Sequence, residues 1–259
     1  MLPAALRLRL RNVPVLTMLR LEEALFRADA RSWFITNEWD QGVARPDARA
    51  IVLGISGKPH QMVHAERAKA EGLPLIKRFS GGGTVVVDED TLYATFIIGA
   101  GALPDVAAYP EPMLGWTSAI YDDALKACGA PNFALREHDY CMRTDGADLK
   151  FGGNAQSISG KRWLHHTSVL WDYAGERMSA LRMPPRQPAY REARAHEQFV
   201  RGLGKSLPSR DGFVDALVAA VGSRLDLRPA VMDDARAALE SPHRRVTAII
   251  EPSQGVASD

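Results

Sequence analysis

Two segments of the chain place a cation beside glycines, an arrangement that suits the binding of a small anion. The first reads K-R-F-S-G-G-G-T, from Lys77 to Thr84, and the second reads K-F-G-G-N-A-Q, from Lys150 to Gln156. Because glycine lacks a Cβ atom, its main-chain N–H groups can approach a ligand closely. Such amides beside fixed cations form a positive concavity for phosphate or carboxylate oxygens. The two segments therefore predict an anionic substrate that is held from two sides.

Other residue types that could do chemistry do not form a known motif. Neither a P-loop nor a G-x-G-x-x-G segment opening a helix occurs in the chain. His165 and His166 are adjacent on a predicted strand, so they point to opposite faces and cannot bind one ion together. We expect one of them to be packed inside and the other to reach solvent. His138 and Cys141 lack a second ligand pair at zinc spacing. We therefore expect no metal site made by a side-chain motif.

Composition narrows the class of protein further. The chain has 259 residues, 32 basic and 31 acidic, which gives a net charge of +1 and argues against a nucleic-acid surface. Its two cysteines are too few for a disulfide framework. No apolar run approaches the roughly 20 residues that span a bilayer. The Arg-rich opening, residues 1–20, is compatible with a transit peptide, although its alternating Leu and Val are typical of a strand. We expect a soluble protein of the cytoplasm or the mitochondrial matrix.

The elements that must position the two glycine segments are mostly hairpins with helices outside them. We expect one hairpin between strands 84–87 and 92–98, across Asp88–Asp90, and another between strands 153–158 and 162–171, across Ser159-Gly160. Hydrophobic spacing predicts helices, the first with its charged residues on the outer face, at about 19–30, 60–70, 116–127, 211–224 and 232–240. The Pro- and Arg-rich segment 182–195 is expected to be a surface loop. This order does not show the regular βαβ alternation of a parallel sheet.

Four motifs, in the same order and at compatible spacing, resemble those of the lipoate–protein ligase A family. R-F-S-G-G-G-T-V-V at 78–86 resembles R-R-x-S-G-G-G-A-V, and L-R-E-H-D-Y at 135–140 resembles G-R-N-D. D-L-K-F-G-G-N-A-Q at 148–156 is similar to D-R-K-x-S-G-S-A, and H-H-T-S-V-L at 165–170 is similar to H-H-G-T-L-L. The likeness covers most of residues 20–173 and is strongest to the shorter eukaryotic ligase-like proteins.

The resemblance implies an α+β fold shared with biotin–protein ligases and class II tRNA synthetases. That fold is a mixed, largely antiparallel sheet flanked by helices, in agreement with the predicted hairpins. We expect residues 1–200 to form the catalytic domain and residues 201–259 to form a short helical extension packed on it. This extension is shorter than the accessory domain of full-length bacterial ligases, so a separate accessory chain could act as a partner.

The resemblance also implies the chemistry, which has two steps. The carboxylate of lipoate attacks the α-phosphate of ATP, bound with Mg²⁺, to give lipoyl-AMP and pyrophosphate. A lysine of a lipoyl domain then attacks the mixed anhydride. The implied acceptors are E2 subunits of 2-oxoacid dehydrogenases and the H protein of glycine cleavage.

The site residues are carried over motif by motif. Lys150 matches the family's catalytic lysine, which contacts the carbonyl and α-phosphate oxygens of the adenylate. Arg136, Asp139 and His166 fall on positions that line the substrate pocket. The remaining matches are expected to bind ATP and lipoyl-AMP, and they are Arg78, Ser80, Gly81, Gly82, Gly83, Thr84, Val85, Val86, Gly153, Asn154 and Ala155.

Departures from the motifs keep other activities open. G-R-N-D reads R-E-H-D here, and H-H-G-T reads H-H-T-S. One alternative is a lipoyltransferase that uses preformed lipoyl-AMP. Another is an octanoyltransferase that works through a thioester on Cys141, nine residues before Lys150, which a hairpin return could bring near the lysine. A biotin ligase is disfavoured, because its G-R-G-R-x-G-R loop is missing, and a non-enzymatic binding protein is disfavoured by the presence of Lys150.

Overall fold

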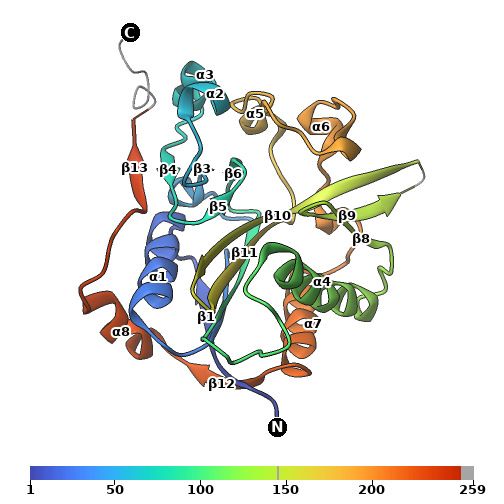
Figure 1. Cartoon of the computed structure of the whole chain (residues 1–259). Coiled ribbons are helices and arrows are strands. Elements are labelled where there is room, and N and C mark those ends of the chain that lie inside the picture. Colours follow the sequence, from blue (N-terminus) through green and yellow to red (C-terminus); the bar gives the residue numbers. More distant parts are fainter. Residues whose placement is uncertain (145, 252–259) are drawn as a thin grey trace.

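The computed structural model describes residues 1–144 and 146–251, and within them a large mixed sheet forms the centre of the molecule (Figure 1). Strand β1 runs parallel to β12 and to β2, and every further pair in the sheet is antiparallel. This confirms the predicted α+β class with a mixed, largely antiparallel sheet. The strands follow the order β12 (Asp226–Ala230), β1 (Ala4–Arg11), β2 (Trp33–Glu38), β7 (Thr91–Ile98), β11 (Arg162–Leu170), β10 (Ala147–Ser159), β9 (Asp139–Thr144) and β8 (Phe133–Arg136), and β5 (Gly81–Gly82) pairs with β10.

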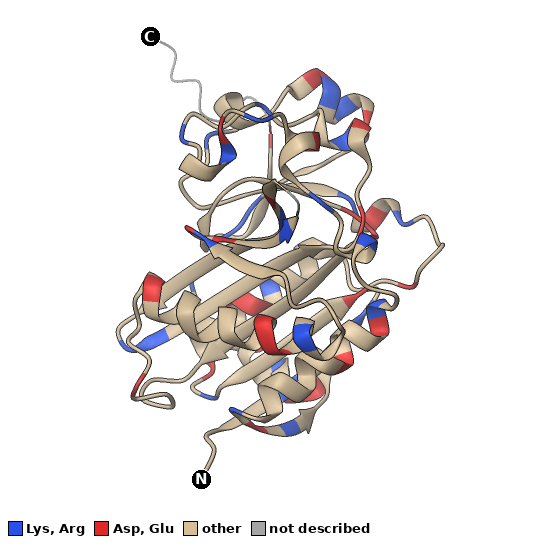
Figure 2. Ribbon diagram, turned by 90° about the vertical axis from the view of Figure 1, so that its right-hand side faces the viewer, with Lys and Arg blue, Asp and Glu red and all other residues tan. Residues whose placement is uncertain are grey.

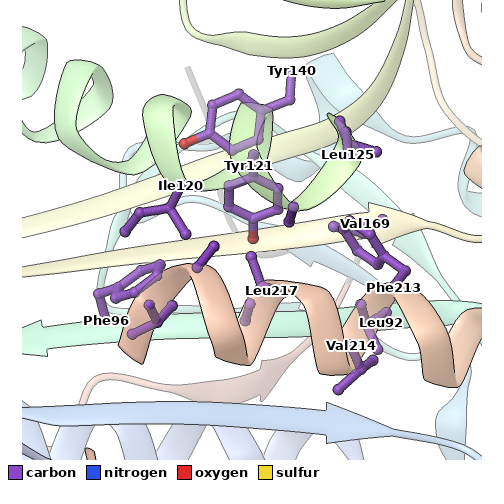
Figure 3. Close-up of a cluster of buried hydrophobic side chains, with 14 of the residues drawn as sticks. Leu92, Phe96, Ile120, Tyr121, Leu125, Tyr140, Val169, Phe213, Val214 and Leu217 are labelled. Carbon is purple, nitrogen blue, oxygen red and sulfur yellow. The ribbon is translucent and has the colours of Figure 1, made fainter. Parts of the chain in front are cut away.

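Helices cover both faces of this sheet because each carries an apolar stripe. Helices α4 (Pro110–Ala127) and α7 (Arg210–Gly222) bury theirs on one face, around Tyr121, Phe213 and Leu217 (Figure 3). Helices α1 (Val15–Ala28) and α8 (Met232–Glu240) pack on the other face. Burial of this kind stabilises a fold by roughly 25 cal/mol for each Å² of apolar surface. The sheet is therefore held rigid from both sides.

A second, small sheet packs with α1, and the glycine segment between two of its strands reaches the main sheet. Its order is β13 (Ala248–Ile250), β4 (Leu75–Lys77), β3 (Ala50–Leu53) and β6 (Val85–Val87). One face packs with α1 and the other against short helices. The short helices and 3-10 turns of the chain are η1 (Pro46–Ala48), α2 (Pro59–Met62), α3 (Ala65–Ala70), α5 (Gly175–Met178), η2 (Ala189–Arg191), α6 (His196–Phe199) and η3 (Leu203–Lys205).

The structure confirms one predicted hairpin and corrects the other. Strands β10 and β11 pair across Ser159 and Arg162 as predicted. The expected hairpin between 84–87 and 92–98 is wrong, because β6 pairs with β3 in the small sheet whereas β7 pairs with β2 and β11 in the main sheet. The turn at Asp88–Asp90 therefore carries the chain from one sheet to the other. Both strands are apolar, and hydrophobicity alone does not identify the strand with which each one pairs.

Three further expectations differ from the structure. Helix 60–70 is divided into α2 and α3, which β-branched Val63 separates in an extended conformation. Glu22 and Glu23 of α1 are buried, 1% exposed each, instead of lying on an outer face. Residues 201–250 contain the two predicted helices, and they also supply β12 to the main sheet and β13 to the small one.

The surface carries charges of both signs. Figure 2 shows basic and acidic residues interspersed over the ribbon, in keeping with the balanced composition. None of the helices in the described part of the chain is long and apolar enough to cross a membrane.

Candidate active site

A cavity of about 770 Å³ lies where the small sheet meets β10 and β11 of the main sheet. The glycine segment forms one wall, and strand β10 with Lys150 forms another. Side chains of α1 and β7 line it as well, among them Leu19 and Tyr93. Residues 184–200, which we call the strap, complete the lining with Pro184, Arg186, Gln187, Pro188, Arg191, His196, Phe199 and Val200.

Backbone pairing joins the two glycine-containing segments on this cavity. Gly82 pairs with Ala155 and Gly81 with Gln156, in antiparallel register between β5 and β10. The sequence predicts that both segments hold one substrate, and the structure brings them to the same hollow.

Gly82 must be glycine for two separate reasons. Its φ of +117° lies in a region that L side chains rarely adopt. A Cβ atom there would also stand 2.6 Å from the carbonyl oxygen of Asn154 and 2.7 Å from Nη2 of Arg78. Gly54 has a related role, since a Cβ atom on it would clash with the carbonyl oxygen of Gly82. Close backbone packing, and not mobility, explains these glycines.

Arg78 supports the glycine segment from behind. Its Nη2 donates to the carbonyl oxygens of Gly83, at 2.8 Å, and Gly81, at 3.3 Å. The side chain is buried, and burial lowers the pKa of its guanidinium to about 10, so it stays charged at neutral pH. Within the described part of the chain, no carboxylate lies within salt-bridge distance of it. The charge of Glu22 acts on this guanidinium from beyond salt-bridge distance and opposes the effect of burial on its pKa. A buried, poorly screened cation of this kind makes the wall attractive to an anion.

Lys150 reaches the cavity from a β-bulge. The register of β9 and β10 shifts between Lys150 and Gly152, which leaves Phe151 as the additional residue, and Phe151 is fully buried. Bulges commonly re-aim a side chain. The Nζ atom of Lys150 lies 2.7 Å from Oδ1 of Asp139 on β9. The lysine side chain is 22% exposed and the aspartate 15%, so the pair is partly shielded from water and still accessible.

Cys141 lies directly opposite Lys150 in the β9–β10 register. The hairpin return that the octanoyltransferase alternative needs is therefore present. The environment of the thiol is nevertheless unfavourable for a nucleophile, because burial raises its pKa to about 12. The thiolate is the reactive form of cysteine. The thiol contacts the hydroxyl of Tyr190, with an Sγ–O distance of 3.4 Å.

Asn154 lines the cavity, but its side-chain amide is hydrogen-bonded to other residues of the protein. Its Nδ2 donates to the carbonyl oxygen of His138 at 2.9 Å, and its Oδ1 accepts from Oγ1 of Thr167 at 2.8 Å. The first bond holds the β8–β9 turn beside β10, and the second joins β10 to β11. The neighbouring Gly153 lies beside Lys150, since a Cβ atom at that position would be in ordinary van der Waals contact with the lysine Cε, at 3.7 Å.

The two adjacent histidines point to opposite faces of β11, and both are buried. The expectation that one of them reaches solvent is wrong, because β11 is a central strand covered on both faces. Nδ1 of His166 lies 2.9 Å from Oε1 of Glu22, and the histidine lines the cavity. His165 faces α4, and burial, with His166 nearby, lowers its pKa to about 3.

Most of the predicted binding residues line the cavity, and two do not. Ser80 is buried outside the lining, where its carbonyl oxygen accepts a bond from the main-chain N–H of Ile55. Arg136 also lies outside it, since its guanidinium forms an ion pair with Asp148 across the β8–β10 region. The lining residues are Arg78, Gly81, Gly82, Gly83, Thr84, Val85, Val86, Asp139, Lys150, Gly153, Asn154, Ala155 and His166.

The lining residue Tyr93 was not predicted, and neither were Glu22 and Tyr190, which are not part of the lining but contact its residues His166 and Asp139. Tyr93 is 2% exposed, and its hydroxyl has no hydrogen-bond partner among the described residues. Glu22, which pairs with His166, was assigned to the outer face of its helix. Tyr190 belongs to the strap, a segment for which the sequence predicted only a surface loop, and its hydroxyl contacts Asp139. The mixture of proline, arginine and aromatic residues in this segment was the feature of the sequence that could have indicated a role at the site.

Comparison with known proteins agrees with this geometry. The family model of the lipoyl protein ligase A/B catalytic domain matches residues 16–222, and the chain belongs to that family. A curated relative from Plasmodium falciparum, described as inactive lipoate–protein ligase 2, is 28% identical over 183 residues. That match covers 60% of the chain and 47% of the relative, so the chain spans about half the length of this relative.

Solved structures of low sequence identity share the fold. A bi-partite lipoate protein ligase from Thermoplasma acidophilum, studied with its E2 lipoyl domain, superposes with a TM-score of 0.71 at 17% identity, over 92% of this chain and 91% of the other. A lipoate–protein ligase A bound with ATP gives 0.69 at 16% identity, over 92% of both chains. A lipoate complex from Plasmodium falciparum gives 0.69 at 16%, over 92% of this chain and 69% of that one.

Proposed function

We propose that this protein is a lipoate–protein ligase, which activates lipoate with ATP and transfers the lipoyl group to a lysine of a lipoyl domain. The observation that carries the proposal is the shared cavity, in which the Lys150 ammonium and the glycine-segment backbone surround one space. ATP and lipoate are the ligands named for two proteins of the same fold. We infer the same two substrates here.

Activation brings two anions together, the carboxylate of lipoate and the triphosphate of ATP. The Arg78 guanidinium and Lys150 supply positive charge on opposing parts of the lining. Preorganised donors stabilise the charge that develops at the α-phosphorus, because they need not reorganise during the reaction. The apolar lining of Leu19, Val52 and Val85 suits the acyl chain. The products of this step are lipoyl-AMP and pyrophosphate.

Mg²⁺ is expected to arrive with the nucleotide. In such sites it is usually held by one or two carboxylates and by phosphate oxygens. Asp139 and Glu137 are carboxylates on the cavity wall, but both oxygens of Asp139 have partners, in Lys150 and Tyr190, and Glu137 accepts from the main-chain N–H of Ala189. We therefore propose that the ion would be held mainly by the phosphate oxygens of ATP. When bound, the ion would neutralise phosphate charge.

Transfer requires an amine to reach the activated carbonyl through the cavity mouth. Lys150 would stabilise the negative charge on the carbonyl and phosphate oxygens as AMP departs. The acceptor would be the lysine of a lipoyl domain, such as that of an E2 subunit or the glycine cleavage H protein. The bi-partite archaeal ligase motivates the further proposal that a separate accessory chain assists activation. We assign catalysis to residues 1–200, and we propose that the following segment is an extension that packs on them and adds β12 and β13 to the two sheets. Residues 252–259 of the predicted extension lie outside the described part of the chain.

Transfer of preformed lipoyl-AMP without activation is the second candidate, because a relative is described as inactive. Pyrophosphate exchange with lipoate and ATP separates the two candidates, combined with mass measurement of an apo lipoyl domain. Exchange and a lipoyl mass increase support the ligase. If the acceptor gains the lipoyl mass from synthetic lipoyl-AMP but not from lipoate and ATP, even after an accessory chain is added to the second reaction, activation is refuted and the transferase is supported. No modification from either donor would refute both.

A further inference from the structure

Four polar side chains form a continuous chain of contacts that begins at the catalytic lysine. Lys150 Nζ lies 2.7 Å from Oδ1 of Asp139. The hydroxyl of Tyr190 donates to Oδ2 of the same carboxylate at 2.8 Å. The Cys141 thiol completes the chain at 3.4 Å from the tyrosine oxygen. Each oxygen of Asp139 therefore has its own partner, one from β10 and one from the strap.

The strap is hydrogen-bonded to the β8–β9 turn, and the residue that follows the strap is hydrogen-bonded to the main chain of Lys150. The main-chain N–H of Ala189 donates to Oε1 of Glu137 at 2.6 Å, and that of Arg201 donates to the carbonyl oxygen of Lys150 at 2.8 Å. Tyr190 also stacks near Phe199, with ring centroids 5.2 Å apart. The backbone and side chain of Lys150 are thus both tied to one segment.

Tyr190 can fix the orientation of the Asp139 carboxylate, which Lys150 alone cannot do. A lysine side chain has a flexible four-carbon stem, and its ammonium has no preferred geometry. A carboxylate that accepts only from that ammonium is free to turn with it. The second hydrogen bond, from Tyr190, restricts the carboxylate plane and so restricts where the ammonium lies. Burial and the adjacent Asp139 raise the pKa of Tyr190, so its hydroxyl stays protonated and keeps donating.

We propose that Tyr190 is a positioning residue, which orients Lys150 through Asp139 and thereby couples docking of the strap to alignment of the catalytic ammonium. Lys150 remains the catalytic residue, because it alone of the three is assigned a contact with the reacting atoms. Only the kinetic test of this inference rests on the proposed function.

The kinetic test compares two Tyr→Phe variants that lose the same atom. In Tyr190→Phe we expect kcat for lipoyl transfer from lipoyl-AMP to fall about tenfold, the scale of a hydrogen bond to a charged group, while KM stays within about twofold. Tyr173→Phe is the matched control, since its hydroxyl donates to the Val200 carbonyl oxygen in the strap and does not reach Asp139. We expect kcat of that control within about twofold of wild type. Equal losses in both variants would overturn the proposal.

A double-mutant cycle separates positioning from a general structural effect. If Tyr190 acts through Asp139, then Tyr190→Phe should have no further effect on kcat in an Asp139→Asn background. If the loss of kcat in the double variant equals the product of the losses in the two single variants, the two residues act independently and the coupling is contradicted.

A readout without turnover keeps this test independent of the proposed function. Lysines can be ¹³C-methylated and the Lys150 signal assigned by its loss in Lys150→Arg. We expect Tyr190→Phe to shift that signal and Tyr173→Phe to leave it in place. An unchanged signal in Tyr190→Phe would refute the positioning role, whereas a shifted signal in a protein that modifies no lipoyl domain would refute the proposed function alone.

Discussion

Gly82 pairs with Ala155, and this contact joins two motifs that lie far apart in the chain. It places the amides of the glycine segment beside the strand that carries Lys150. The left-handed φ of Gly82 and the nearby Arg78 guanidinium leave no room for a side chain at that point. The contact is therefore the structural basis of the proposed substrate site.

A methyl group at Gly82 should disrupt this contact. We expect Gly82→Ala to lower the free energy of unfolding by about 1–3 kcal/mol, the usual cost of a strained backbone position, and to weaken lipoate binding. Gly83→Ala is the control for stability, because nothing lies within 4 Å of a Cβ atom there. Urea unfolding and calorimetric titration with lipoate would measure both effects. Similar unfolding midpoints for the two variants would contradict this account.

Removal of the Lys150 ammonium, to which we assign a catalytic role, should affect activity and not folding. Since Lys150 is partly exposed, Lys150→Ala is expected to fold normally. Its rate of lipoylation should fall by roughly 10²–10³-fold, as for loss of a donor that stabilises transition-state charge. Lys161→Ala, at an exposed hairpin turn, controls for the loss of a lysine as such. Unimpaired turnover in Lys150→Ala would remove this residue from the mechanism.

The buried thiol should be inert in the folded protein. With a pKa of about 12, only about one Cys141 in ten thousand is ionised at pH 8. We expect a thiol reagent such as DTNB to label Cys141 slowly until urea is added, with Cys128, which is partly exposed, labelled first. Incubation with octanoyl-acyl carrier protein should yield no thioester on Cys141. Rapid labelling of Cys141, or a mass increase that Cys141→Ser abolishes, would revive the octanoyltransferase alternative.

His165 should make stability depend on pH in the acid range. Its folded pKa of about 3 lies below the ordinary 6.5, so between these values only the unfolded state binds the proton. Its contribution to stability is therefore present above pH 6.5 and is lost as pH falls toward 3. Between pH 7 and pH 5 this loss amounts to roughly 2 kcal/mol, because the slope approaches 1.36 kcal/mol for each pH unit as the unfolded imidazole becomes protonated.

The variant His165→Gln tests this prediction by urea unfolding at pH 7 and pH 5. We expect it to lose less stability between the two pH values than wild type does. His60→Gln, at an exposed position, is the control and should keep the wild-type dependence. An identical pH dependence in all three proteins would show that His165 does not titrate as inferred.

The sequence by itself determined the local chemistry of this protein. Three glycines near Arg78 and a second glycine pair near Lys150 were enough to predict an anion site, and the apolar strands were enough to predict hairpins. These features are local, since backbone freedom, charge and hydrophobic period depend on neighbouring residues. The helix at 232–240 and the β10–β11 hairpin follow from the same information. The mixed sheet was implied by the family resemblance.

The tertiary structure alone decided which distant groups meet. β6 and β7 both have apolar patterns, and only long-range pairing assigned them to different sheets. Glu22 is buried because His166 and Thr95 satisfy its carboxylate, which no helical period can indicate. The contact of Tyr190 with Asp139 likewise depends on how the strap folds back. Such choices are made by packing and by the pairing of buried polar groups, and these are properties of the whole fold.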